Sequence, residues 1–258
     1  MSEFVCNRLL LTNDDGIDAP GLNTLIAVAS TLAREVWVVA PSQDQSCTSQ
    51  SLSLHNPVRF RQVGEKQYRV NGTPADCVVL AVRHLMSDAP PDFILSGINR
   101  GANLGNETVF SGTVGAAMTG LLLGFHSVAL SQFFTDGGNV RWDTARLASE
   151  KVLRQLLTTP RQTQICFNVN IPDTDPDKIL NIVRTSQGTG NLQSIGITVR
   201  EDPRGVPYAW LNLERTVKCE RADSENTAVR AGNISVTPLH YDRTQYDFGS
   251  VFTSPDVS

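Results

Sequence analysis

Two adjacent carboxylates, Asp14 and Asp15, directly follow a short apolar segment near the start of the chain. A turn at Gly16 lets both side chains converge on one point, and converging like charges need a cation. Oxygen ligands favour hard ions such as Mg²⁺ or Mn²⁺, whose incomplete protein shell leaves positions for water and a phosphate oxygen. The pair therefore predicts a divalent-metal site. The alternative is that both acids only cap the next helix and form an Asx turn.

A second segment whose residues could bind a ligand runs from residue 96 to residue 113. Its glycines and asparagines, Asn99 and Asn103 among them, allow backbone and amide groups to approach a ligand closely. Ser111, Gly112 and Thr113 then open an apolar helix. Free N–H groups at a helix N-terminus bind anions, and hydroxyl groups add donors to phosphate oxygens. The bland alternative is that this triplet is only a helix cap.

The segment from residue 41 to residue 53 is rich in hydroxyl side chains, including Ser46. Such a segment is usually a solvated loop. If it borders the same crevice as the acidic pair, however, one of its hydroxyl groups can complete an oxygen shell around a metal ion.

The elements that must position these residues alternate between strands and helices, which predicts an α/β fold. We expect a doubly wound, three-layer, Rossmann-like and mostly parallel sheet with right-handed crossovers. In such a sheet the ligand crevice lies at the carboxyl ends of the strands, where the three segments above would meet. The predicted strands are 8–12, 36–39, 93–96, 127–130 and 164–170, with a hairpin at 58–70, and the predicted helices are 22–32, 73–86, 114–124 and 143–158.

The local composition changes beyond Pro172, where Asp, Pro and Gly become frequent and short strand-like segments follow. We therefore expect residues 1–172 to form the Rossmann-like metal- and phosphate-binding core. Residues 173–258 should form a β-rich extension and C-terminal arm that packs on the core and serves oligomerisation.

Composition narrows the class of protein further. The net charge of −4, without a run of Lys or Arg, argues against a nucleic-acid polymer as partner. No apolar run approaches the roughly 20 residues that span a bilayer, and no export signal is recognisable, so we expect no membrane association. Five widely spaced cysteines fit reduced thiols in a cytoplasm, and four isolated histidines argue against a zinc site.

Along nearly all its length the sequence resembles the SurE (survival protein E) nucleotidases. Six ordered motifs carry the resemblance. They comprise Leu10 to Ile17 with Ala19-Pro20-Gly21, Val38 to Pro41 with Ser46, Gly72 to Val78, Ser96 to Gly105, Phe110 to Ala117, and Ser235 to Leu239.

The resemblance implies one Mg²⁺ or Mn²⁺ ion per subunit, with Co²⁺ as an alternative, held by Asp14, Asp15, Ser46 and Asn99. Of these, Asp14, Asp15 and Asn99 would be catalytic. The residues expected to face phosphate and substrate are Asn13, Asn103, Ser111, Gly112 and Thr113. Such proteins hydrolyse nucleoside 5′- and 3′-monophosphates to nucleoside and phosphate, and some trim short polyphosphate. They are usually dimers or tetramers that exchange C-terminal arms or hairpins.

Two departures from the family pattern stand out. Cys47 follows Ser46 where the family commonly has glycine, which would cost the loop backbone freedom. The segment 224–228 departs from the usual Thr-Asp-aromatic pattern, which could change assembly. These departures keep a non-enzymatic nucleotide-binding stress protein as the alternative function.

Two other enzyme classes are disfavoured by the residues themselves. A dinucleotide-dependent oxidoreductase would need a G-x-G-x-x-G turn, and the first turn instead carries acids where pyrophosphate would sit. A phosphoaspartate mechanism would be expected with spaced rather than adjacent aspartates.

Overall fold

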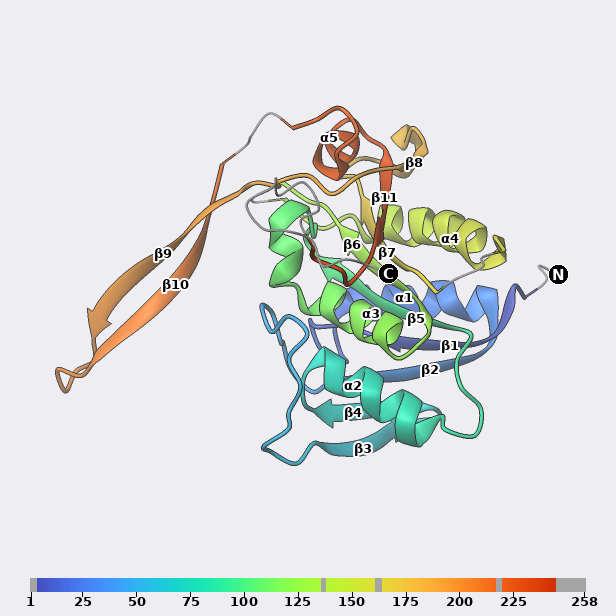
Figure 1. The fold of residues 1–258 in the computed structure, drawn as a ribbon, viewed down its shortest axis with the longest axis horizontal. Coiled ribbons are helices and arrows are strands. Elements are labelled where there is room, and N and C mark those ends of the chain that lie inside the picture. The colour runs from blue at the N-terminus through green and yellow to red at the C-terminus, as the bar shows by residue number, and fades with distance from the viewer. Residues whose placement is uncertain (1–3, 136–137, 161–163, 217–219, 245–258) are drawn as a thin grey trace, which may run out of the picture.

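The computed structural model describes residues 4–135, 138–160, 164–216 and 220–244. Within these residues one large sheet has the strand order β3-β4-β2-β1-β5-β6-β7-β11-β8, and β9 and β10 form a separate pair (Figure 1). The strands of the large sheet are β1 (Cys6–Thr12), β2 (Ala33–Pro41), β3 (Arg59–Gly64), β4 (Gln67–Asn71), β5 (Phe93–Arg100), β6 (His126–Gln132), β7 (Cys166–Ile171), β8 (Ile182–Arg184) and β11 (Ile234–Leu239).

The middle of this sheet is parallel, from β4 through β2, β1, β5 and β6 to β7. Strand β3 pairs with β4 in antiparallel fashion, and β11 does so with β7. The predicted α/β class with a mostly parallel sheet is therefore confirmed. Because the parallel strands point the same way, the loops that follow β1, β2 and β5 leave the sheet at one edge.

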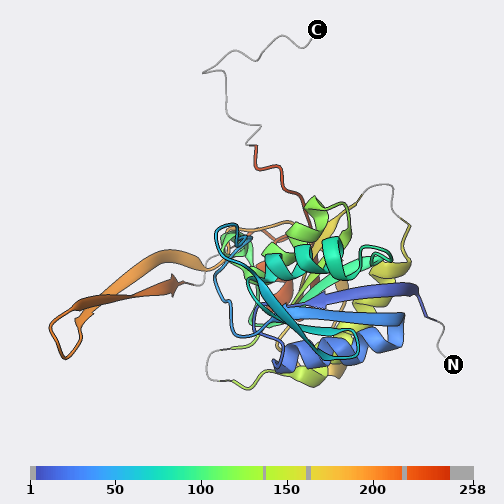
Figure 2. The ribbon, with the colours of Figure 1, turned by 90° about the horizontal axis from the view of Figure 1, so that it is seen from below.

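Helices cover both faces of the sheet, as Figures 1 and 2 show. Helices α1 (Pro20–Leu32) and α4 (Trp142–Thr158) contact each other on one face, and α2 (Pro74–Leu80) contacts α3 (Gly112–Leu122) on the other. Successive strand residues point to opposite faces, so Leu9 and Leu11 pack in the core beneath α1 and α4 while Leu10 packs beneath α2. Burial on both faces explains why β1 reads as an unbroken apolar run.

The start of α2 follows directly from local sequence. The hydroxyl of Thr73 accepts a hydrogen bond from the backbone N–H of Asp76, and the carboxylate of Asp76 accepts one from the backbone N–H of Thr73. This reciprocal capping box, with Pro74 at the first helical position, confirms the predicted helix start. A π-helical turn at Ala81–Leu85 continues α2.

Strand β5 is longer than the sequence pattern indicated. The prediction ended this strand at Ser96, but β5 continues to Arg100 after an irregularity in its pairing with β6. Gly97 has a φ of +135°, and a Cβ there would lie 2.3 Å from the carbonyl oxygen of Leu130. The glycine therefore lets the strand bend and continue, which places Asn99 on a strand beside Ser131.

Beyond Pro172 the chain contributes two more strands to the large sheet, one before and one after the projecting β9–β10 hairpin. Strands β8 and β11 pair with each other, and α5 (Glu225–Arg230) precedes β11. The hairpin of β9 (Leu192–Glu201) and β10 (Pro207–Arg215) projects away from the helices and the sheet (Figures 1 and 2). The end of the expected arm, residues 245–258, lies outside the described residues. In the described part of the chain no helix combines the length and the hydropathy needed to cross a bilayer.

Candidate metal and phosphate site

Asp14 is the residue at which three separate segments meet. It is buried, and its carboxylate accepts a hydrogen bond from the hydroxyl of Thr113 in the first turn of α3. Its backbone carbonyl accepts one from the backbone N–H of Gln45 at 2.8 Å, in the loop after β2. The sequence prediction that these loops share one edge of the sheet is borne out by these contacts.

The acidic pair does not cap α1. The N-cap of that helix is Ala19, which makes no side-chain capping bond. The alternative interpretation of Asp14 and Asp15 as helix-capping residues is therefore wrong.

Asp15 points toward a different neighbour. Its carboxylate is half-buried and accepts a hydrogen bond from the backbone N–H of Arg100 at 3.2 Å. Beside it, the side-chain nitrogen of Asn99 donates to the carbonyl oxygen of Gly101 at 2.9 Å. Because this bond engages the side-chain nitrogen and orients the amide, the Asn99 side-chain oxygen is left as an acceptor or ligand.

The two carboxyl groups lie in surroundings that disfavour negative charge. Burial raises the pKa of Asp14 to about 6, against the lowering effect of the Thr113 hydrogen bond, and the nearby Asp15 raises it further. The pKa of Asp15 is also raised, mainly by burial and in part by the charge of Asp44. The hydrogen bond from the backbone of Arg100 opposes this shift. A divalent cation would relieve this electrostatic cost.

The donor chemistry at this edge fits such an ion. The described residues contain no group of three or more His, Cys, Asp or Glu side chains that could hold a metal. An ion at Asp14 and Asp15 would therefore have to complete its shell with amide or hydroxyl oxygens and water, a set that suits Mg²⁺ or Mn²⁺.

Ser46 lies in the correct loop, but its hydroxyl is engaged elsewhere. Its backbone N–H and its hydroxyl both donate to one oxygen of Asp44, at 2.7 and 2.6 Å. The side chain is exposed, one residue beyond the Gln45 contact with Asp14. The next residue, Cys47, has a φ of +62°, in the left-handed region that favours glycine.

The start of α3 packs tightly against Asp14. The hydroxyl of Ser111 caps the helix by accepting from the backbone N–H of Val114 at 3.0 Å. A Cβ on Gly112 would lie 2.8 Å from the Cβ of Asp14. The first turn of α3 thus holds the Asp14 carboxylate directly, which the sequence pattern did not reveal.

Asn103 belongs to a buried polar network that sequence reasoning missed. Its side-chain nitrogen donates to the hydroxyl of Ser131, and its backbone N–H donates to the side-chain oxygen of Asn170, both at 2.8 Å. The side-chain nitrogens of Asn168 and Asn170 donate to its carbonyl oxygen. The available signal was the alternation of polar residues on the otherwise apolar β7.

Asn13 closes the turn after β1. Its side-chain nitrogen donates to the carbonyl oxygen of Gly16 at 2.8 Å, and its side-chain oxygen is buried without a partner among the protein atoms described. The structure therefore places Asn13 beside the acidic pair as a turn residue.

Comparisons with known proteins identify relatives of this chain. The profile of the family described as "Survival protein SurE" matches residues 9–194. The chain is 52% identical over 238 residues to "5′-nucleotidase SurE 1" of Burkholderia lata, covering 92% of each, and 46% identical to "5′-nucleotidase SurE" of Methylobacterium radiotolerans, covering 92% of this chain and 94% of that protein.

Among solved structures, the SurE protein from Aquifex aeolicus superimposes with a TM-score of 0.80 at 36% sequence identity, and the match covers 93% of this chain and 95% of that one. The motifs, the fold and the extent of these matches establish that the chain belongs to the SurE family.

Proposed function

We propose that this chain is a divalent-metal-dependent phosphomonoesterase that hydrolyses nucleoside 5′- and 3′-monophosphates to nucleoside and phosphate, and that it also accepts short polyphosphate. Its relatives are named 5′-nucleotidases. The single observation that carries the proposal is the bond between Thr113 and the Asp14 carboxylate, because it joins the acidic pair to the start of α3 in one site.

We assign the metal ligands to Asp14, Asp15, Ser46 and Asn99, with Mg²⁺, Mn²⁺ or Co²⁺ as the ion. When bound, the ion supplies positive charge that polarises a phosphoryl oxygen and lowers the pKa of a coordinated water. The hydroxyl of Ser46 would have to turn away from Asp44 to join this set. The Asn99 oxygen requires no such change, because the amide is already oriented by Gly101.

The chain's own residues supply positioning and proton transfer. Thr113 orients Asp14, and the backbone of Arg100 orients Asp15, so one of the two carboxylates can receive a proton from the attacking water. We assign Asn13, Asn103, Ser111, Gly112 and Thr113 to the phosphate-facing wall. Asn103 is suited to this role because its buried network fixes its position before substrate arrives.

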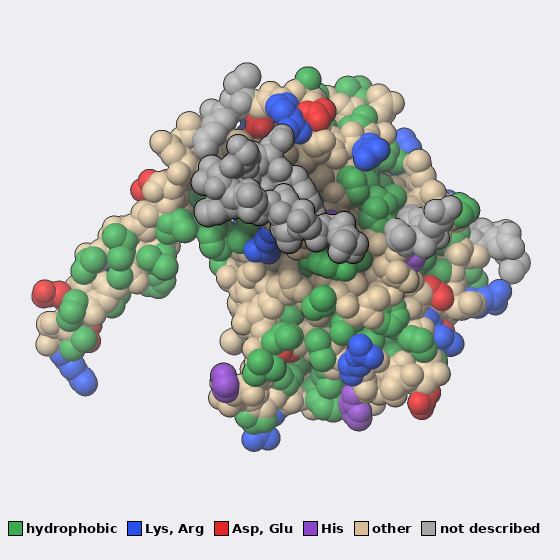
Figure 3. Space-filling view, in the orientation of Figure 1, with side chains coloured by type: hydrophobic (Ala, Val, Ile, Leu, Met, Phe, Trp, Pro, Cys, Tyr) green, Lys and Arg blue, Asp and Glu red, His purple; other side chains and the backbone are tan. Residues whose placement is uncertain are grey.

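We further propose that the chain assembles as a homodimer or homotetramer through residues 173–258. The register of β9 and β10 places Ile197 opposite Leu211 and Val199 opposite Ala209, and these side chains form an aliphatic face on the projecting hairpin. Leu211 is 73% exposed and Ile197 is 64% exposed. Figure 3 shows hydrophobic side chains along the hairpin, and such a surface is typical of a protein contact.

Phosphate release tests the proposed activity. The purified protein is incubated with 5′-AMP, 3′-AMP and tripolyphosphate, with EDTA and after Mn²⁺ or Mg²⁺ is restored. We expect release that EDTA abolishes and metal restores, and we expect Asp15→Asn to lose almost all of it. Asp18→Asn is the matched control, because Asp18 lies on the same loop but pairs with Arg69 at the surface.

Three outcomes separate the functional alternatives. Metal-dependent release that Asp15→Asn removes supports the proposal. Retention of 5′-AMP without phosphate release, measured by equilibrium dialysis, would establish the non-enzymatic nucleotide-binding alternative. Wild-type turnover by Asp15→Asn would show that the centre is assigned to the wrong residues.

A further inference from the structure

A cleft of roughly 520 Å³ opens directly beside the acidic pair, on the face of the sheet that α1 and α4 cover. Asp15 and Arg100 lie at its polar side. Pro20, Val140 and Trp142 supply apolar wall, with Asn139 among the other lining residues. This volume falls within the range of roughly 300–1,000 Å³ typical of small-molecule sites. The cleft thus combines an apolar wall with a carboxylate of the predicted metal site.

Trp142 is fixed in this wall by its packing. The residue is half-buried against the core beneath α1 and α4. A Cβ on Gly21 would lie 1.9 Å from the backbone carbonyl oxygen of Ile98 and 3.0 Å from the ring atom Cη2 of Trp142, so the glycine lets α1 approach both β5 and the indole. Trp142 is also one of the residues that line the cleft. A flat aromatic surface held in this way suits a flat aromatic ligand.

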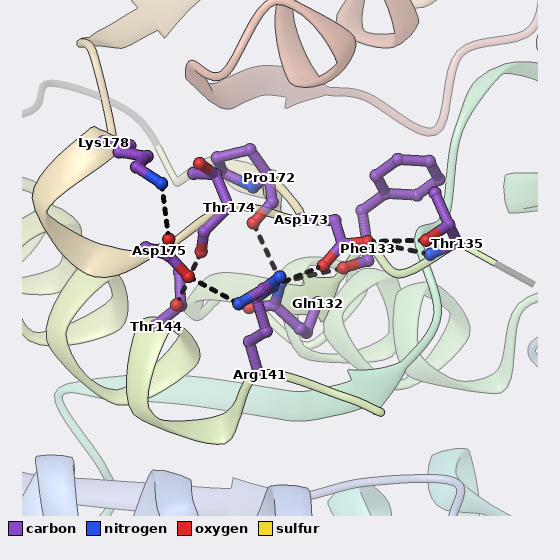
Figure 4. Close-up of polar contacts among 10 residues, drawn as sticks. All are labelled: Gln132, Phe133, Thr135, Arg141, Thr144, Pro172, Asp173, Thr174, Asp175 and Lys178. Atoms are coloured by element: carbon purple, nitrogen blue, oxygen red, sulfur yellow. Dashed lines mark hydrogen bonds and ion pairs between the residues drawn. The ribbon is translucent and has the colours of Figure 1, made fainter. Parts of the chain in front are cut away.

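The segment that carries Trp142 is clamped by Asp173, as Figure 4 shows. One carboxylate oxygen of Asp173 accepts from the backbone N–H and the hydroxyl of Thr135, both at 3.0 Å. The other oxygen accepts from the Nε of Arg141 at 3.0 Å, and Asp175 binds another guanidinium nitrogen of Arg141 at 2.6 Å. The residue next to Trp142 is therefore tied to the loop after β7.

Arg100 closes the polar side of the cleft. Its guanidinium lies 5.1 Å from the ring centre of Phe134, and its charge acts on the carboxylate of Asp15. The side chain is thereby held near the reacting centre, where a cation favours an anionic substrate.

We infer that this cleft is the subsite for the nucleoside part of the substrate, with the base stacked on the indole of Trp142 and the phosphate reaching the acidic pair past Asp15. The inference rests on the proposed function. It adds a specificity-determining residue, Trp142, and a positioning residue, Asp173, that the resemblance and the comparisons do not assign. A base-free phosphomonoester would use the acidic pair but not the cleft.

The test compares 5′-AMP with ribose 5-phosphate in Trp142→Leu, which keeps apolar volume but removes the aromatic face. We expect kcat/KM for 5′-AMP to fall by roughly ten- to a hundredfold, since base stacking on an aromatic side chain has this value, and kcat/KM for ribose 5-phosphate to stay unchanged. Trp142→Phe should retain most of the preference. Leu147→Ala, an exposed position one turn further along α4, is the matched control and should change neither substrate.

A binding measurement separates this inference from the proposed activity. In a Trp37→Phe, Trp210→Phe background, Trp142 is the remaining tryptophan, and adenosine should quench its fluorescence saturably while ribose should not. Asp173→Asn should weaken this binding several-fold without changing turnover of ribose 5-phosphate.

Each combination of results decides one of the two claims. Equal losses for both substrates in Trp142→Leu, or no quenching by adenosine, would overturn the nucleoside subsite even if wild-type turnover is normal. Saturable quenching in a protein that releases no phosphate would retain the subsite and overturn the proposed activity.

Discussion

At the carboxyl edge of the large sheet, polar side chains are buried and bonded to residues far away in the sequence, whereas along the β9–β10 hairpin apolar side chains stand exposed. Asp14 reaches Thr113, and Asn103 reaches Asn170. On the hairpin, Ile197 lies opposite Leu211 in the strand pair, and both residues are more than 60% exposed. A site that must hold a charged reaction centre needs fixed geometry within the chain, while an exposed apolar face is stabilised only by something outside it.

The strongest test of the fixed edge is Gly112→Ala. The added methyl group would approach Asp14 to 2.8 Å at Cβ and 3.0 Å at one carboxylate oxygen, so the carboxylate must shift. A shift of about 1 Å at a reacting centre can cost about a hundredfold in rate. We therefore expect kcat/KM for 5′-AMP to fall about a hundredfold, as measured by phosphate release.

The matched control is Gly64→Ala in the β3–β4 hairpin. A Cβ there would meet the Gln67 side chain at 3.2 Å, which can move aside. Full activity of both variants would mean that the contact between Gly112 and Asp14 is not needed for turnover.

A second test concerns Glu225, a residue of α5 whose side chain bonds to the segment that follows β5. This buried carboxylate accepts from the backbone N–H of Gly105 and from the hydroxyl of Thr237. Glu225→Ala would leave both donors without their partner, which costs about 2–4 kcal/mol of unfolding free energy. Urea denaturation measures the loss. A change below about 0.5 kcal/mol would show that these bonds are dispensable.

Because Glu225 is ionisable, its contribution to the unfolding free energy depends on pH. Burial raises its pKa above the value in the unfolded chain. Its contribution to stability is therefore fully present below the unfolded-chain pKa and is lost as the pH rises through the folded-state pKa. Relative to Glu225→Gln, we expect the wild-type unfolding free energy to decline as the pH rises from about 4.

Glu35 provides a control of opposite sign. The hydrogen bond from Lys66 lowers the pKa of Glu35, so its contribution is present above the unfolded-chain pKa and is lost as the pH falls through the folded-state pKa. The comparison of wild type with Glu35→Gln should thus run in the reverse direction. Parallel trends for the two carboxylates would contradict the assigned environments.

Local signals explain what the sequence predicted well. The capping box at Thr73 and Asp76 depends on residues three apart, so it is visible in the sequence. The convergence of Asp14 and Gln45 at one edge follows from the strand pattern, because parallel strands share their carboxyl ends.

The parts that the sequence did not predict depend on distant contacts. The bond between Thr113 and Asp14 spans 99 positions, and the one between Asn103 and Asn170 spans 67. The predicted strand ended at Ser96, and only the neighbouring carbonyl of Leu130 explains why a glycine is required at position 97 inside β5. The Trp142 cleft likewise depends on how α4 packs beside Gly21.

A smaller effect is expected at Cys47, where the edge departs from the family pattern. Its φ of +62° costs a residue with a Cβ about 1–2 kcal/mol relative to glycine. A glycine there would avoid this cost, but the greater conformational entropy of glycine in the unfolded chain would offset about 0.5–1 kcal/mol of the benefit. We expect Cys47→Gly to raise the unfolding free energy by up to about 1 kcal/mol. Cys47→Ala keeps the Cβ and should give no increase, and equal effects of both substitutions would rule out backbone strain as the cause.

The smallest effect on the isolated chain should come from the hairpin. In Ile197→Asn with Val199→Thr, we expect the unfolding free energy of dilute protein to change by less than about 0.5 kcal/mol, because both side chains are more than 60% exposed. The same substitutions should lower the molar mass found by light scattering at high protein concentration, because they remove apolar surface from the face that the proposed assembly would bury. A large loss of stability in dilute protein, with unchanged molar mass at high concentration, would mean that this face stabilises the fold of the single chain. The hairpin would then resemble the sheet edge, where contacts within the chain hold the side chains in place.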